Sequence, residues 1–247
     1  MKHLLLLSLS FGLLLNAQNT ILLGNKIINP SFISLIDTTV FYTKLNNINR
    51  EIGLFESEIG AIYNIKKNYF HSSVYQYGYK HYKETIVKTA SSKQINKDVF
   101  FGIGINFHHL YLYDTDNYQA LSFDVGAAII KDRFSFYLLL KNPANSAYLE
   151  NDIENILILS PVYLWTQNLV SQLDLGVSTQ AVIALKHQLT YTYQNRVNLS
   201  LLQGLNPVQY GFQLSYSINK TQFSSQYLHY KHRQSTSIMI IYTLGND

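Results

Sequence analysis

The clearest hydrophobic pattern in the chain runs from Val208 to Ile218, where apolar or aromatic residues alternate with polar or small ones without interruption. Side chains on a β-strand point to opposite faces with a period of two, so this segment predicts a strand with one apolar and one polar face. Residues 219–220 follow as a turn, and residues 221–227 are predicted to run back beside the first strand. A two-residue loop places Phe223 opposite Tyr216, which predicts a β-hairpin.

The same alternation recurs at short intervals along most of the chain. The candidate strands with an apolar and a polar face are 56–64, 101–113, 121–129, 134–140, 172–178, 183–193, 197–201 and 237–244. Residues 69–80, 82–89 and 155–166 are strand-like but less regular, residues 90–98 are predicted as a polar loop, and Pro161 indicates a bulge or a strand end. No segment has the period of an amphipathic helix of three turns. About 14 strands joined by short turns and longer loops predict an all-β, transmembrane, antiparallel up-and-down β-barrel.

Composition favours a membrane barrel over a soluble sandwich. Only 14% of the 247 residues are charged, against roughly 25% in soluble proteins, and the chain has 20 Tyr and 13 Phe. The polar faces carry mainly Gly, Ser, Thr, Asn and Gln, which suit a barrel lumen better than a solvated exterior. Aromatic residues near strand ends, such as Tyr111, Tyr191 and Tyr210, predict the girdles at the two membrane interfaces.

The N-terminus predicts export to the outer membrane of a Gram-negative bacterium. Lys2 precedes an apolar run from Leu4 to Leu15, and a small residue, Ala17, follows, as in a signal peptide. We therefore expect a signal peptide at 1–17, an N-terminal leader or plug segment at 18–36 and the transmembrane barrel at 37–247. The chain after residue 17 contains no run of about 18 apolar residues, so no membrane-spanning helix is predicted.

Candidate site residues fall on the polar faces and in the leader. The residues predicted to line the lumen are Glu56, Glu58, Asn106, His108, Asp124, Asp174, Lys186 and Gln188. Unpaired charge in a low-dielectric interior is costly, so these charges predict either salt bridges that plug a narrow barrel, with Lys186 neutralising Asp174 or Asp124, or a water-filled path. The leader motif is Asn29, Pro30 and Ser31, where proline argues against a central strand.

Several chemistries are not indicated. The chain has no Cys, its net charge is only +4, and no dense run of Lys and Arg predicts a nucleic-acid groove. His108 and His109 are adjacent on a strand and point to opposite sides, so they cannot share a metal. We predict no catalytic, metal or cofactor site and no enzyme activity. The alternative, an outer-membrane hydrolase, requires a Ser–His pair on the outer surface, and His187 lies among the outward residues.

Short motifs add a family resemblance that covers most of the mature chain. They are the Ala17-Gln18 junction, Asn29-Pro30-Ser31, Phe123–Ala127, Lys141-Asn142-Pro143 and Gly204–Pro207. In these the chain resembles the FadL-type outer-membrane barrels of Bacteroidetes, and within them the PorV/PorQ family associated with type IX secretion. A second resemblance is to the PorP/SprF barrels. The FadL-type resemblance implies a barrel of fourteen strands with an N-terminal segment tucked inside. The chain is much shorter than these proteins, which implies small extracellular loops.

Three functions follow as hypotheses. The main one is a scaffold or accessory component of a secretion or surface-protein system, with outer-membrane lipid and other secretion or outer-membrane proteins as partners. This hypothesis predicts a closed lumen. The second is a FadL-like channel for small or hydrophobic compounds, which predicts a continuous path past the lumen charges. The third is the hydrolase described above.

Overall fold

A computed structural model of the protein describes residues 29–36, 38–49, 53–65, 68–113, 117–148, 151–179, 182–230 and 233–244. The predicted signal peptide and leader residues 18–28 lie outside the described residues. Within these ranges the chain forms one short 3-10 helix, η1 (Pro30–Leu35), and sixteen strands. No helix among them is long and apolar enough to span a membrane.

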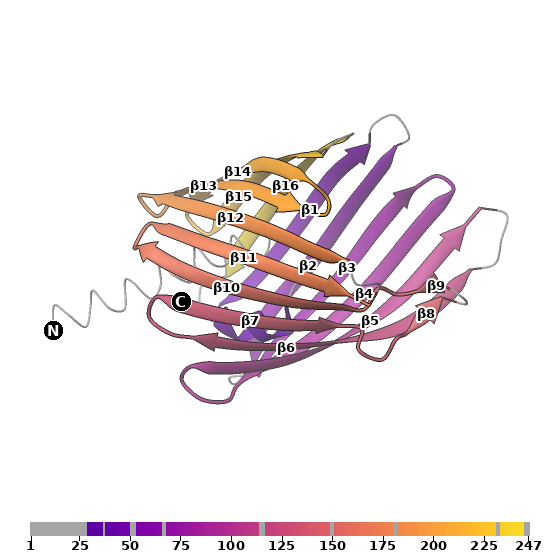
Figure 1. Ribbon diagram of the computed structural model, residues 1–247, viewed down its shortest axis with the longest axis horizontal. Coiled ribbons are helices and arrows are strands. Elements are labelled where there is room, and N and C mark those ends of the chain that lie inside the picture. The colour runs from indigo at the N-terminus through magenta and orange to yellow at the C-terminus, as the bar shows by residue number, and fades with distance from the viewer. Residues whose placement is uncertain are drawn as a thin grey trace.

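Fourteen of the described strands close into an antiparallel barrel in which β1 pairs with both β2 and β16 (Figure 1). They are β1 (Thr39–Asn49), β2 (Leu54–Ile65), β3 (Asn68–Tyr79), β4 (Tyr82–Gln94), β5 (Val99–Leu112), β6 (Tyr118–Ile130), β7 (Phe134–Lys141), β10 (Ile156–Thr166), β11 (Leu169–Ser178), β12 (Ile183–Tyr193), β13 (Val197–Leu205), β14 (Gln209–Ile218), β15 (Thr221–Tyr230) and β16 (Arg233–Leu244). The remaining two, β8 (Ala147–Tyr148) and β9 (Asn151–Asp152), pair with each other in the connection from β7 to β10. The predicted fold class and strand number are confirmed.

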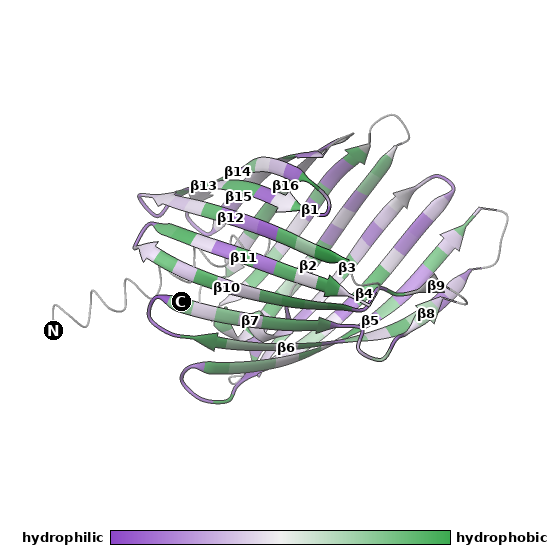
Figure 2. Cartoon of the chain, viewed as in Figure 1, coloured by the Kyte–Doolittle hydropathy of each residue, from purple (hydrophilic) through white to green (hydrophobic). Residues whose placement is uncertain are grey.

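The alternation of the sequence becomes an outer and an inner face. Phe212 and Leu214 are 50% and 49% exposed, whereas Gln213 and Ser215 are 2% and 1% exposed. Phe223 lies opposite Tyr216, as the hairpin predicted. Coloured by hydropathy, the strands alternate between hydrophobic and hydrophilic residues along their length (Figure 2). The apolar side chains therefore form a lipid-facing belt, and the polar ones fill the interior.

The two ends of the barrel differ. The connection containing β8 and β9 lies at one end, which we call the loop end (Figure 1). The opposite end, the turn end, carries the start of β1, the last strand residue of β16 and the turns at 131–133, 194–196 and 219–220. Since short turns face the periplasm in outer-membrane barrels, the loop end faces outward.

Two local expectations are wrong. Pro161 lies in the middle of β10 and stays in register with Phe136 of β7, while the irregularity in pairing with β11 comes later, between Leu164 and Thr166. Residues 160 and 161 of β10 have no paired residue on β11. Proline has no N–H to donate, so it is tolerated at a position where β11 requires none. Residues 90–98 were predicted to form a polar loop, but residues 90–94 belong to β4, which has polar residues on both faces there.

The leader helix η1 plugs the turn end from inside. Phe32 and Leu35 pack in one apolar cluster with residues of β5, β6, β7, β10 and β11. Ile33 and Ile36 pack in a second cluster with residues of β1, β2, β3 and β16. The helix thus presents apolar side chains to opposite walls, and all six of its residues are buried. The expectation of an N-terminal segment inside the barrel is confirmed for residues 29–36.

Candidate functional site

The leader motif is built into the wall. Asn29 Oδ1 caps η1 by accepting hydrogen bonds from the Ser31 backbone N–H at 3.0 Å and from Ser31 Oγ at 2.8 Å. Asn29 Nδ2 donates to the Leu138 carbonyl at 2.8 Å. Glycines at 102 and 126 allow this approach, because a Cβ atom there would overlap the backbone of Pro30 or the amide of Asn29. The predicted motif residues therefore anchor the plug.

A cavity of about 670 Å³ lies in the barrel between the plug and the loop end. Pro30 of the leader lines it at one end, and Tyr148, Ile153 and Glu154 of the β7–β10 connection line it at the other. Its remaining lining residues come from β3–β7 and β10, and they include an apolar group, Ile86, Leu110, Leu112 and Ile156, and a polar group, His71, Tyr75, Glu84, Lys88, Asn106, His108, Asp124 and Lys141. The cavity is amphipathic and large enough for a small organic molecule.

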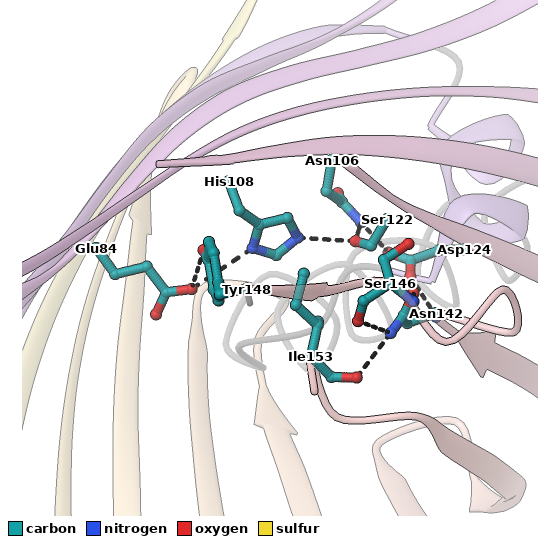
Figure 3. Close-up of polar contacts among 9 residues, drawn as sticks. All are labelled: Glu84, Asn106, His108, Ser122, Asp124, Asn142, Ser146, Tyr148 and Ile153. Carbon is teal, nitrogen blue, oxygen red and sulfur yellow. Dashed lines mark hydrogen bonds and ion pairs between the residues drawn. The ribbon is translucent and has the colours of Figure 1, made fainter. Parts of the chain in front are cut away.

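Tyr148 connects the loop end to the cavity wall. Its hydroxyl donates to Glu84 Oε1 at 3.1 Å, and the same oxygen lies 3.5 Å from His108 Nδ1 (Figure 3). The other ring nitrogen of His108, Nε2, lies 2.7 Å from the hydroxyl oxygen of Ser122. Burial, followed by the negative charge of Glu84, raises the pKa of Tyr148, so its hydroxyl remains a donor. The β8–β9 hairpin is thereby latched to β4.

Asn142 orders the same connection from its base. Its backbone has a positive φ of 51°. Its side-chain Nδ2 donates to the carbonyls of Ile153 at 2.7 Å and Ser146 at 3.2 Å (Figure 3). Its Oδ1 accepts from the Ser146 backbone N–H at 3.1 Å. Its own backbone N–H lies 3.3 Å from Asp124 Oδ1. Asp124 also accepts from Asn106 Nδ2 at 2.8 Å and stands opposite Lys141 in the β6–β7 register. The lumen residue Asp124 therefore supports the loop that covers the cavity.

Glu56 and Glu58 form a second buried polar cluster. Glu58 Oε1 accepts from Tyr42 at 3.1 Å and Ser73 at 2.9 Å, and Lys88 Nζ lies 3.5 Å away. Glu56 accepts from Asn46 Nδ2 at 2.7 Å and from Tyr75 at 3.1 Å. Both carboxylates are buried and have several donors, as a charge in a low-dielectric interior requires. This cluster adjoins a smaller cavity of about 230 Å³ at the loop end, lined in part by Tyr75 and Glu84.

The predicted lumen residues thus divide into groups. Asn106, His108 and Asp124 meet at the cavity, and Glu56 and Glu58 lie in the neighbouring cluster. Asp174, Lys186 and Gln188 lie on β11 and β12, away from the cavity lining. Asp174 and Lys186 are cross-strand partners, which matches one of the two pairings proposed for Lys186. Asp174 accepts from Gln172 Nε2 at 2.7 Å, and Lys186 is exposed, so this pair lies in a wetter setting than Glu58.

Sequence reasoning missed several residues of the site. Glu84, Lys88, Lys141, Tyr75 and Tyr148 line the cavity but were not among the candidates. For β4 the signal was available, since Tyr82, Glu84, Ile86 and Lys88 occupy alternate positions and share the inner face. For Tyr148 no periodicity could help, because it lies in a loop. Among the described residues no group of three His, Asp or Glu side chains is placed to hold a metal ion.

Comparison with known proteins identifies the fold. No protein-family model matches the chain, and no curated protein matches its sequence. Among solved structures, the toluene transporter TbuX of Ralstonia pickettii is similar with a TM-score of 0.65 and 9% identity, over 88% of this chain and 92% of that one. The CymD monoaromatic hydrocarbon channel has a TM-score of 0.63 and 8% identity, over 89% of this chain and 92% of that one. The toluene transporter TodX of Pseudomonas putida has a TM-score of 0.61 and 10% identity, over 87% of this chain and 91% of that one.

These TM-scores and coverages, at identities of 8–10%, show a common fold. The chain has the barrel fold of these transporters and channels.

Proposed function

We propose that this protein is an outer-membrane channel for small hydrophobic compounds of about the size of a monoaromatic ring. The observation that carries the proposal is the amphipathic cavity of about 670 Å³ between the loop end and the leader plug. Ligand pockets for small molecules typically measure about 300–1,000 Å³ and combine apolar walls with a few polar groups. The fold shared with two toluene transporters and a monoaromatic hydrocarbon channel supports the same substrate class.

The apolar lining offers a surface for an aromatic or aliphatic ligand. Ile86 and Leu110 come from neighbouring strands, Ile153 comes from the β7–β10 connection, and Ile156 is the first residue of β10. Entry is expected at the loop end, beneath the hairpin that Tyr148 latches to Glu84. Release towards the periplasm requires the leader to move, because Pro30 forms the opposite boundary of the cavity. The buried carboxylates lie beside this route and are satisfied by protein donors.

The test is uptake of toluene by sealed vesicles whose outer leaflet contains lipopolysaccharide. Leu110→Trp fills the cavity, because Leu110 lines it and is 8% exposed. Ile105→Trp is the matched control on the same strand, since Ile105 is 45% exposed on the lipid-facing side. We expect vesicles with the wild type or Ile105→Trp to take up toluene several times faster than protein-free vesicles, and Leu110→Trp to remove most of that gain. Equal rates for all vesicles would contradict the proposal.

A second candidate is the secretion-associated scaffold implied by the PorV/PorQ resemblance. Its support is the filled interior at the turn end, where η1 packs against both walls, together with the bonded charges of Glu56 and Glu58. Under this proposal the partners are other outer-membrane or secreted proteins, and the source is a bacterium of the Bacteroidetes. Affinity purification of the intact barrel from its native outer membrane tests it. Stoichiometric copurification of a secretion component, with no toluene uptake, would favour the scaffold.

The processing of the chain is a further part of the proposal. Cleavage after Ala17 would leave Gln18 at the mature N-terminus, with residues 18–36 as the leader and 37–247 as the barrel. N-terminal sequencing of protein purified from the outer membrane tests this expectation, and retention of Met1 would contradict it.

A further inference from the structure

A hydrogen-bonded row of three polar side chains interrupts the lipid-facing belt. Ser171 Oγ lies 2.9 Å from His187 Nε2, and His187 Nδ1 lies 3.3 Å from the side-chain amide of Gln203. The three residues come from consecutive strands, β11, β12 and β13. In the register His187 is directly opposite Gln203, and Ser171 is diagonal to His187. The row therefore depends on the barrel pairing and could not be located from sequence spacing alone.

Alternation places all three side chains on the outer surface. Their strand neighbours Gln172 and Gln188 are buried in the interior, at 4% and 7% exposure. Leu201, which shares a face with Gln203, is 58% exposed. The registered and sequential neighbours on the outer face are apolar, namely Leu173, Leu185, Leu189, Leu201 and Leu205. Ser171 and His187 are half-buried and Gln203 is exposed, so a lipid molecule can reach them.

The depth of the row suits a lipid ester. Gln203 is opposite Tyr210, which is 57% exposed and stacks on His229 with ring centroids 4.8 Å apart. Both aromatic rings lie within one residue of the loop-end termini of β14 and β15, where an interfacial aromatic girdle is expected. From this girdle the row leads away from the loop end to Ser171, which is two residues from the turn-end start of β11. The ester groups of lipids are found at both interfaces, and Ser171 lies closer to the one at the turn end.

We propose that Ser171, His187 and Gln203 form a serine-nucleophile site that hydrolyses acyl esters of membrane lipids. Nucleophilic serine catalysis requires a hydroxyl hydrogen-bonded to a base that is itself held by a third group, and these three side chains occupy those places. In the structure the amide nitrogen of Gln203, Nε2, faces His187 Nδ1 at 3.3 Å, and a half-turn of the terminal amide brings its oxygen to the same place. With its oxygen towards Nδ1, it accepts the Nδ1 proton and leaves Nε2 free to receive the Ser171 proton.

The reaction balances without any group beyond lipid and water. Ser171 Oγ attacks the ester carbonyl carbon while His187 Nε2 takes the hydroxyl proton. The ester C–O bond then breaks, and His187 returns the proton to the departing alcohol, leaving an acyl group on Ser171. Water attacks this acyl group with His187 as the base, which releases a fatty acid and restores the hydroxyl. Because an amide stabilises the imidazolium less than a carboxylate would, and the neighbours are leucines without an oxyanion donor, we expect slow turnover.

The test uses the full-length folded barrel in mixed micelles with an alkyl fluorophosphonate probe. We expect the probe to phosphonylate the wild type, and mass spectrometry of the peptides to locate the adduct on Ser171. Ser171→Ala and His187→Ala should each lower the labelling rate at least about 100-fold, and Gln203→Leu about 10-fold. Ser225→Ala is the matched control, because Ser225 is an exposed serine of the same belt, opposite Leu214 and Ile238. It should label like the wild type.

A second measurement follows fatty-acid release from phosphatidylcholine, which should disappear with labelling in Ser171→Ala. Gel mobility before and after heating shows whether each variant is folded. Mapping of the wild-type adduct needs no variant at all. An adduct on any residue other than Ser171, or no labelling above heat-denatured protein, would mean that the three side chains only satisfy one another in lipid, and would overturn the proposal. Neither result bears on toluene uptake, so the channel stands or falls separately.

Discussion

The side chain of Asn29 occupies the space that a Cβ atom would need at Gly126. The same asparagine caps η1 through Ser31 and donates to the Leu138 carbonyl, so one residue fixes both the leader's conformation and its position. A glycine on the inner face of β6 is thus a requirement of the plug.

Gly126→Val is therefore expected to displace the leader. Overpacking of this kind costs about 1–3 kcal/mol, and the leader relieves it by leaving its place against β6. Hydrogen exchange of the amides of residues 31–36 measures the effect, and we expect their protection to fall. Gly104→Ala is the control, because its Cβ would meet Pro30 at 3.4 Å, an ordinary contact. Unchanged protection in Gly126→Val would show that the wall yields instead.

Leu214→Arg is expected to impair assembly of the barrel. Leu214 is 49% exposed on the lipid-facing side, and arginine near the bilayer midplane costs about 2–4 kcal/mol. Ser217→Asn, on the inner face of the same strand and only half-buried, should be tolerated. Heat-modified gel mobility after refolding into lipid vesicles measures both. Equal sensitivity at the two positions would contradict the assigned faces.

Lys88→Met is expected to destabilise the barrel more than Lys186→Met. Lys88 Nζ is 3.5 Å from Glu58 Oε1, whose side chain is 5% exposed, so its loss removes a cation from a buried carboxylate and costs on the order of 2 kcal/mol. Lys186 is exposed opposite Asp174, where pairs contribute about 0–1 kcal/mol. Urea unfolding in lipid vesicles gives both values. In a double-mutant cycle, adding Glu58→Gln to Lys88→Met should restore part of the loss.

Tyr148→Phe is expected to release the hairpin without unfolding the barrel. The change removes the 3.1 Å hydrogen bond to Glu84, a bond to a charged group that contributes about 1.5–3 kcal/mol. We expect faster hydrogen exchange at residues 147–148 and 151–152 and faster toluene uptake. Tyr111→Phe, on the lipid-facing side of β5, should change neither. If uptake were unchanged while exchange increased, the hairpin would not control entry.

The barrel and the assignment of its two faces could be predicted from the order of residues. Alternation has a period of two whatever the neighbours are, so the burial of Gln213 and the exposure of Leu214 follow from residue order alone. The lumen positions of Glu56, Glu58, Asn106 and His108 follow in the same way. The pattern failed for β1, where Val40, Phe41 and Tyr42 are all apolar or aromatic, because the inner face of that strand packs on the leader.

Tertiary structure decided which residues meet. Tyr148 reaches Glu84 across 64 positions of the chain, and Asn29 reaches Leu138 across 109. Likewise Ser171, His187 and Gln203 become neighbours only when three strands adopt one register. Periodicity reports the direction of a side chain from its own strand, but contact also depends on strand order, stagger and the path of the leader. These are set by closure of the whole barrel, which satisfies every strand edge in a membrane that offers no other hydrogen-bond partners.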